Sequence, residues 1–250
     1  MHPVFILLIA HWYLSLFCQT FFLHRYAAHK MFTMNKFWEK VFYIFTFICQ
    51  GSSFLSPYAY GLLHRMHHAY TDTEKDPHSP SYDKNLFAMM LRTKNVYNDI
   101  LNHRVEIDER FKGDVPYWKS LENIGDNWMV RLMWVAVYVG FYFYFIDLST
   151  EWWMLIFLPA NFLMGPLHGA VINWFAHKYG YTNFKVKDTS KNLMPLDVFM
   201  FGEGYHNNHH KNGQSPNFGF KWYEIDPAWL IIWTLNKLSI IKITKQEVAA

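Results

Sequence analysis

The sequence predicts an all-α integral membrane protein with a polar helical cap on one side of the bilayer. Hydrophobic residues make up 52% and aromatic residues 20% of the 250-residue chain, whereas charged residues make up 17%, below the roughly 25% of soluble domains. Several apolar runs are about long enough to cross a bilayer. Eight of the 14 histidines lie in three short clusters near these runs.

The net charge of +3 is small, and the sequence has no basic stripe with interleaved aromatic residues. We therefore expect the lipid bilayer, and not a nucleic acid, as a partner. Both cysteines, Cys18 and Cys49, lie within apolar runs and far from any CxxC spacing, which predicts small buried residues. The ligands of any metal ion in this chain must therefore be mainly histidine imidazoles.

The first predicted span covers residues 3–23, which contain no Asp, Glu, Lys or Arg and have about the length that a transmembrane helix needs. No positive segment precedes this run and no small-residue cleavage site ends it, so we do not expect a cleaved signal peptide. Arg25 and Lys30, Lys36 and Lys40 follow it. The positive-inside tendency places this end in the cytoplasm and the N-terminus outside.

The next apolar run, residues 41–63, is interrupted by residues 50–53 and by Ser56-Pro57. If this run crossed the membrane once, His29 and His64 would lie on opposite sides. We therefore expect an interfacial or re-entrant segment, which keeps both histidines on the cytoplasmic side.

Residues 69–127 are polar and mixed in charge, with a helical pattern over 87–110, and they predict the first part of a cytoplasmic cap. Two further spans are expected over residues 128–146 and 152–172, joined by a short turn without Lys or Arg. Residues 177–250 complete the cap and include an aromatic helix over 227–241 that we expect to lie at the membrane interface.

The histidine clusters predict a metal site with two ions. On an α-helix, positions i, i+3 and i+4 lie within one turn, so an HxxHH box can direct three imidazoles to one place. Eight imidazoles exceed what one ion accepts, which indicates a dinuclear centre. The clusters are His24 and His29; His64, His67 and His68; and His206, His209 and His210.

Imidazole suits Fe, Zn, Cu and Ni, so the ligand type alone does not identify the metal. A structural zinc ion would take four ligands, usually including Cys, and would leave half of these histidines unexplained; a zinc hydrolase stays open as an alternative. Two metals below the lipid head groups and next to acyl chains favour activation of O₂ against an unactivated C–H bond, and therefore iron.

The boxes HxxxxH, HxxHH and HxxHH, in the contexts HRMHHAYTDTEKDPH and GEGYHNNHH, resemble the membrane-bound acyl-CoA desaturases of the stearoyl-CoA Δ9 type, in a short bacterial form. The resemblance covers nearly the whole chain. In that family an NxxxHxxG segment supplies a ninth histidine, which implies that His177 is a ligand and that Asn173 reaches one iron through a water. It also implies a mushroom-shaped helical protein with two irons where the spans meet the cap, and a narrow bent tunnel for the acyl chain.

The resemblance implies one membrane desaturase domain over residues 1–250, in the bacterial inner membrane with the histidines facing the cytoplasm. It implies O₂-dependent insertion of a cis double bond at Δ9, with no catalytic side chain beyond the metal ligands. Leu63 stands where the acyl-CoA enzymes carry Asp, so acyl-CoA and acyl-lipid both stay open as substrates. The sequence has no haem-binding HPGG segment, which implies a separate electron donor of the ferredoxin, rubredoxin or cytochrome b5 type.

Three carboxylates, Glu203, Asp72 and Asp76, are candidates to accept N–H bonds from the ligand imidazoles, and are as readily explained as solvated or capping groups. Arg25 and Arg65 directly follow ligand histidines, and we expect each to meet a phosphorylated head group or to face solvent. The other histidines, taken singly, are expected to be ordinary core or surface residues: His2, His11, His78, His103 and His168.

Two other functions fit the same residues. A di-iron lipid hydroxylase or ketolase would use the same boxes, although the GEGYHNNHH and DPH details favour the desaturase. A metal-binding membrane transporter without enzymatic activity would place its ligands near the bilayer midplane, whereas these clusters lie at the ends of the predicted spans.

Overall fold

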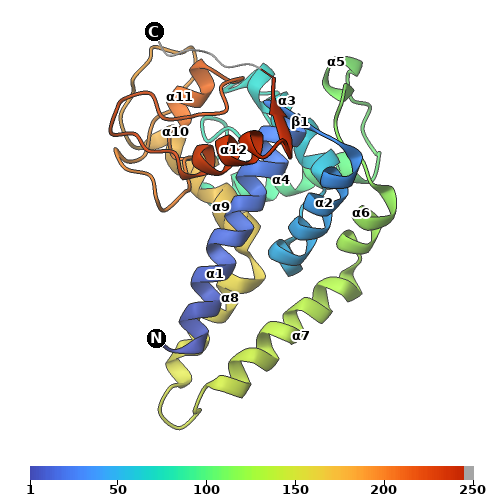
Figure 1. Cartoon of the computed structure of the whole chain (residues 1–250), viewed down its shortest axis with the longest axis vertical. Coiled ribbons are helices and arrows are strands. Elements are labelled where there is room, and N and C mark those ends of the chain that lie inside the picture. The colour runs from blue at the N-terminus through green and yellow to red at the C-terminus, as the bar shows by residue number, and fades with distance from the viewer. Residues whose placement is uncertain (245–250) are drawn as a thin grey trace.

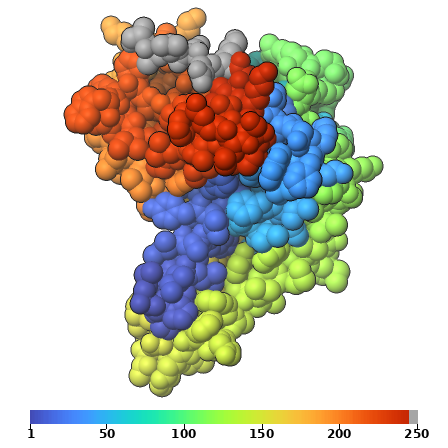
Figure 2. Space-filling model, in the orientation of Figure 1, coloured from blue at the N-terminus to red at the C-terminus, as the bar shows by residue number. Residues whose placement is uncertain are grey.

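A computed structural model describes residues 1–244 of the chain. The described part is mainly helical, and its helices form a broad cap from which a narrower bundle projects (Figure 1). The bundle contains α1 (Pro3–Phe17), α7 (Trp128–Phe145) and α8 (Leu158–Phe162). The space-filling view shows the same division, with α1 and α7 in the narrow part (Figure 2).

The first predicted span is a helix, and it continues beyond residue 23. Pro3 occupies its first turn, where the missing N–H costs nothing, and the His2 side chain accepts a hydrogen bond from Val4 N. After Phe17 the helix becomes a π-helix, Cys18–Ala28. The whole helix, Pro3–Ala28, is long and apolar enough to cross a membrane.

The interrupted run forms two helices that do not continue each other, α2 (Lys36–Gln50) and α3 (Pro57–Tyr70), with a single 3₁₀ turn, Gly51–Ser53, between them. Asn35 caps α2 and Ser56 caps α3 through their side chains. Both helices pack against the π-helix Cys18–Ala28. The chain therefore turns back in this region, as the interruption predicts, and the first two histidine clusters meet.

The span predicted over residues 128–146 is the helix α7, whose surface is mostly exposed and apolar, as contact with lipid would require. The span predicted over residues 152–172 is sharply bent. Helical segments Trp152–Phe162 and Met164–Lys178 meet at an angle of 74°. Pro166 has no N–H to give to Phe162 O, and that oxygen accepts from Ser52 Oγ at 3.0 Å instead.

The first segment of this bent pair comprises the 3₁₀ helix Trp152–Phe157 and α8. The second comprises α9 (Met164–Ala170), a π-helix (Val171–Phe175) and α10 (Ala176–Lys178). By length and composition, two helices can cross a membrane, or three if the bent pair counts as one span; this holds for residues 1–244.

The cap contains α4 (Leu86–Leu101), α5 (Glu109–Lys112), α6 (Lys119–Asp126), α11 (His206–Lys211) and α12 (Pro227–Lys237). The helix predicted over 87–110 ends at Leu101, and the one predicted over 227–241 ends at Lys237. Contrary to the all-α expectation, Ile241–Ile243 forms a strand, β2, which pairs antiparallel with β1 (Phe32–Met34). The last six residues of the predicted cap, 245–250, lie outside the described part.

An aromatic core joins the cap to the first helix. Phe21, Phe22 and Tyr26 of the π-helix are buried against Phe32 of β1 and Tyr43 of α2. Large aromatic side chains bury much apolar surface and favour edge and stacked contacts. This core packs the π-helix, and with it His24, against the cap.

Candidate metal centre

The eight box histidines and His177 converge in two buried groups. In each group the ligand nitrogens all lie within 4.8 Å of one another. The first group consists of His24, His29, His64, His68 and His209, and the second of His67, His177, His206 and His210. These are all of the histidines that the sequence predicted as ligands.

Each HxxHH box divides its histidines between the two groups, so the expectation that one box directs three rings to one place is wrong. On α3, His64 and His68 belong to the first group and His67 to the second. Positions i and i+4 of an α-helix are about 40° apart, whereas i+3 and i+4 are about 100° apart. The i, i+4 pair therefore stays together and the i+3 ring diverges.

On α11 the division is the reverse. His206 and His210, the i, i+4 pair, belong to the second group, and His209 belongs to the first. Each box therefore gives two rings to one group and one ring to the other. Removing either helix would break both groups.

The spacing of His24 and His29 depends on the π-helix that carries them. On an α-helix, residues i and i+5 lie about 140° apart and could not share a site. Here His29 N donates to His24 O at 3.1 Å, the i→i+5 bond of a π-helix. The wider turn brings the two ring centroids to 5.0 Å.

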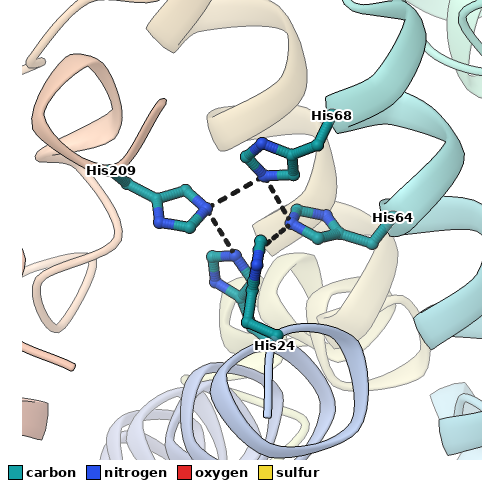
Figure 3. A group of neighbouring side chains, drawn as sticks. His24, His64, His68 and His209 are labelled. Carbon is teal, nitrogen blue, oxygen red and sulfur yellow. Dashed lines mark hydrogen bonds between the residues drawn. The ribbon is translucent and has the colours of Figure 1, made fainter. Parts of the chain in front are cut away.

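Figure 3 shows four rings of the first group, those of His24, His64, His68 and His209, pointing nitrogen atoms toward one another. Nε2 of His64 lies 2.9 Å from that of His29 and 2.9 Å from that of His68. Nε2 of His209 lies 3.0 Å from Nε2 of both His68 and His24. Where the lone pairs of these nitrogens face one another, they repel unless a proton or a metal cation lies between them.

Protons are poor candidates for those cations. Burial, and then the neighbouring imidazoles, lower the pKa of His29, His64, His68 and His209 well below the ordinary value. Neutral imidazoles are the form that binds metal ions. The first group therefore fits a metal ion that accepts nitrogen ligands.

The second group also consists of buried imidazoles whose nitrogens lie close together. Nε2 of His177 lies 3.0 Å from Nε2 of His206. Among the described residues, Nε2 of His67 and of His210 is buried and has no hydrogen-bond partner. A buried polar atom without a partner costs free energy, and a metal ion at this place would remove that cost.

Two of the three predicted carboxylates contact ligand histidines directly. Nδ1 of His24 donates to Glu203 at 2.7 Å, and Nδ1 of His67 donates to Asp76 at 2.9 Å. Burial alone would raise the pKa of each carboxyl group, but the histidine contacts outweigh burial, and both pKa values are lowered. Both groups are therefore ionised, and they leave Nε2 of each ring free to bind.

The third predicted carboxylate, Asp72, acts through another residue. It accepts hydrogen bonds from the backbone N and the Oγ1 of Thr189 at 2.7 and 2.8 Å. Thr189 Oγ1 lies 3.2 Å from Nδ1 of His177, whereas Asp72 itself is 3.9 Å from that nitrogen.

Sequence reasoning missed a fourth carboxylate, Asp188. Nδ1 of His210 donates to it at 3.1 Å. The only signal in the sequence is one acidic residue within a lysine-rich stretch, residues 185–191, and no spacing connects it to His210. His78, expected to be an ordinary core or surface residue, is buried; its ring lies 4.1 Å from that of His67, and the two form a further cluster with Asp76.

The expectation that Arg25 and Arg65 meet head groups or solvent is wrong. Arg25 is fully buried; it donates to Asp226 and to Pro216 O at 2.9 Å, and its guanidinium lies over Phe218. Arg65 donates to four backbone carbonyls, those of Ala27, Ala28, Phe111 and Gly113. The two arginines anchor the segments that carry the first and second boxes.

A cavity of about 640 Å³ adjoins both groups. His24 and His64 of the first group and His206 of the second form part of its wall. Aliphatic side chains form much of the remainder, among them Leu16, Leu55, Leu63, Leu163 and Ile172, and Asn173 and His168 also line it. A hydrocarbon chain in this cavity would lie against both groups.

Comparisons with known proteins agree with this site. A family model described as fatty acid desaturase matches residues 1–239. The Delta-9 acyl-lipid desaturase 1 of Arabidopsis thaliana is 30% identical, over 87% of this chain and 67% of its own length. The sn-1 stearoyl-lipid 9-desaturase of Synechocystis sp. is 29% identical (88% and 64%), and a hex-5-enoyl-[acyl-carrier protein] acetylenase of Moorena producens 28% (94% and 74%).

Proposed function

Because the chain belongs to the fatty acid desaturase family, we propose that it is an O₂-dependent oxidoreductase that introduces a cis double bond at Δ9 of a saturated fatty acyl chain. One observation carries the proposal: two convergent imidazole groups lie in the wall of an apolar cavity. The first group binds one Fe ion and the second group the other. The second group has one histidine fewer, and we assign its further ligand to a water held by Asn173.

The bound irons, cycling between Fe²⁺ and Fe³⁺, supply the activation of O₂ that removal of hydrogen from an unactivated C–H bond needs. The chain's own residues hold the ligands in one orientation. Glu203, Asp76 and Asp188 each accept a hydrogen bond from an Nδ1–H and so turn Nε2 toward the metal. Asp72 does the same for His177 through Thr189. Such partners fix the tautomer and raise the basicity of the ring.

The apolar cavity wall selects a hydrocarbon chain and excludes water from the reacting methylenes. Between the two open carriers, acyl-CoA and acyl-lipid, we favour acyl-lipid. The arginines beside the ligands, Arg25 and Arg65, are engaged inside the protein and cannot bind the phosphates of coenzyme A. Two relatives are named as acyl-lipid desaturases.

We propose one multi-pass domain over residues 1–250, in the bacterial inner membrane with the histidines facing the cytoplasm. Lys30, Lys36 and Lys40 after the first helix, and the lysines that follow His177, support this orientation. Electrons come from a separate protein of the ferredoxin, rubredoxin or cytochrome b5 type.

The test is to express the chain in cells that make few unsaturated fatty acids and to analyse their lipids by gas chromatography and mass spectrometry. We expect new cis-Δ9 monoenes, absent with His206→Ala and retained with His103→Asn, since His103 is exposed and outside both groups. Hydroxy fatty acids would instead indicate a hydroxylase. Purified protein that binds zinc alone would refute the iron assignment.

A further inference from the structure

Three exposed lysines lie around the outer edge of the second group. Lys187 precedes Asp188, which accepts the hydrogen bond from His210, and Lys211 follows His210. Lys185 follows Phe184, whose backbone N donates to Asn207 of α11 at 2.9 Å. We call Lys185, Lys187 and Lys211 the basic patch.

Within residues 1–244, no carboxylate compensates the charge of the basic patch. Among the described residues, none of its three lysines has a carboxylate within ion-pair distance. The nearby carboxylates are engaged elsewhere, Asp188 with His210 and Asp72 with Thr189. Clustered charge of one sign attracts partners of the opposite sign over distance.

The cap surface around α4 and α5 is different. There, cations and carboxylates pair with each other, as in Arg92–Asp83 at 2.6 Å and Lys112–Glu109 at 2.7 Å. Paired charges of this kind leave little net field. The basic patch is therefore a local feature and not a property of the whole cap.

The basic patch also lies next to a short route into the metal centre. The side chain of Asp188 is 13% exposed and that of His210 only 1%, and the two are joined by a hydrogen bond of 3.1 Å. His210, a buried member of the second group, is thus hydrogen-bonded directly to a carboxylate that reaches the surface. Electron transfer slows steeply with distance, so a donor gains most by docking where so little protein intervenes.

The proposed reaction requires electrons from outside. Forming CH=CH from CH₂–CH₂ releases two electrons and two protons, whereas reducing O₂ to two H₂O consumes four of each. The remaining two electrons and two protons must be supplied, the electrons by a reduced carrier.

We propose that the basic patch is the docking surface for an acidic electron-carrier protein, and that electrons enter the second group at the Asp188–His210 edge. This inference rests on the proposed function. Redox partners typically form small and short-lived interfaces, in which opposite charges set the association rate. An anionic bilayer is disfavoured as the occupant, because α11 lies at the end of the cap opposite the projecting α7 (Figure 1).

The experiment uses the full chain in nanodiscs and a reduced plant-type [2Fe–2S] ferredoxin, an acidic protein, as the probe. Binding is measured directly by surface plasmon resonance at low and high salt. The test variant is K187E/K211E, and the matched control is K84E/K119E, which changes the net charge equally at two exposed cap lysines without ion pairs among the described residues. We expect the test variant to weaken binding about tenfold at low salt, and the control to leave it unchanged.

Two further measurements separate the explanations. Reduction of the bound metal by ferredoxin, followed by stopped-flow absorbance, should slow in the test variant but stay normal with dithionite, a small reductant that needs no docking. Vesicles of phosphatidylglycerol should bind wild type and test variant alike.

Equal ferredoxin binding by both double variants, or no ferredoxin binding by the wild type at low salt, would overturn the proposal. So would a test variant that loses vesicle binding and keeps ferredoxin binding, because the patch would then be a lipid contact. If cells make no monoenes and yet ferredoxin binding depends on the patch, the desaturase assignment fails and the docking surface stands.

Discussion

His209 and His210 are neighbours in the sequence, yet they belong to different metal-binding groups. Their ring planes are 85° apart and the ring centroids are separated by 5.9 Å. Nε2 of His209 faces His24 and His68, whereas the ring of His210 lies 4.3 Å from that of His206, centroid to centroid. One box therefore contributes to both proposed irons, and this division is open to experiment.

Paired histidine substitutions test the division. In His206→Ala/His210→Ala both changes fall in the second group, and we expect the purified protein to keep roughly one iron. In His206→Ala/His209→Ala one ligand is lost from each group, and we expect occupancy of both irons to fall. Inductively coupled plasma mass spectrometry measures the iron, and circular dichroism checks the fold. Equal iron contents in the two variants would contradict the division of the box.

Asp188→Asn tests the residue that sequence reasoning missed. The amide no longer offers a charged acceptor to His210 Nδ1–H, so we expect iron affinity of the second group to fall about 10–100-fold. Competition with a chelator measures the affinity. The control is Asp99→Asn, which alters an exposed surface pair with Arg104; if both variants lose iron equally, Asp188 has no special role.

Two glycines of α9 line the cavity and test its shape. A Cβ at Gly169 would meet only Asn173 Nδ2, at 3.9 Å, whereas a Cβ at Gly165 would lie 3.1 Å from Ser53 O. We expect Gly169→Leu to fold and to shift product toward shorter acyl chains, because its side chain takes up cavity space. Gly165→Leu should instead lower the melting temperature. Chromatography of products and thermal unfolding measure the two effects; unchanged chain lengths with Gly169→Leu would show that the acyl chain lies elsewhere.

Arg25→Met tests the buried ion pair. Without its guanidinium, Asp226 is left buried and uncompensated, so we expect a loss of about 3–5 kcal/mol in the free energy of unfolding. Arg25→Met/Asp226→Asn should recover part of the loss, because no charge is then left alone and the amide oxygen can still accept from Phe218 N or Trp229 N. Denaturant unfolding in detergent gives both values. A double variant less stable than the single one would refute the pairing.

The pH dependence of the metal-free protein follows from its histidines. Burial and the neighbouring imidazoles lower the pKa values of His64 and His209 in the folded state from an ordinary value of 6.5, so below about pH 6.5 the unfolded chain binds more protons at these residues than the folded one. The free energy of unfolding should therefore fall as the pH drops from 7 to 5. Thermal unfolding after chelation measures this fall. His64→Gln should flatten the profile, and a profile unaffected by this change would contradict the cause.

The sequence alone predicted the nine histidines that the structure brings together, the interruption at residues 50–53, the start of the first helix and the extent of α7. These features are readable because they are local: apolar run length sets a span, and Ser56-Pro57 starts a helix wherever it lies in the fold. That the chain turns back between α2 and α3 also followed from one constraint, that His29 and His64 must meet.

Only the tertiary structure decided how the rings are shared and oriented. The division of each box depends on how α3 and α11 face each other. The bend at Leu163 depends on Ser52, whose hydroxyl donates to Phe162 O, the carbonyl oxygen to which Pro166 has no N–H to donate. Asp188 reaches His210 across 22 residues of chain. Periodicity and motif spacing carry no information on such contacts, because they arise from packing between elements distant in sequence.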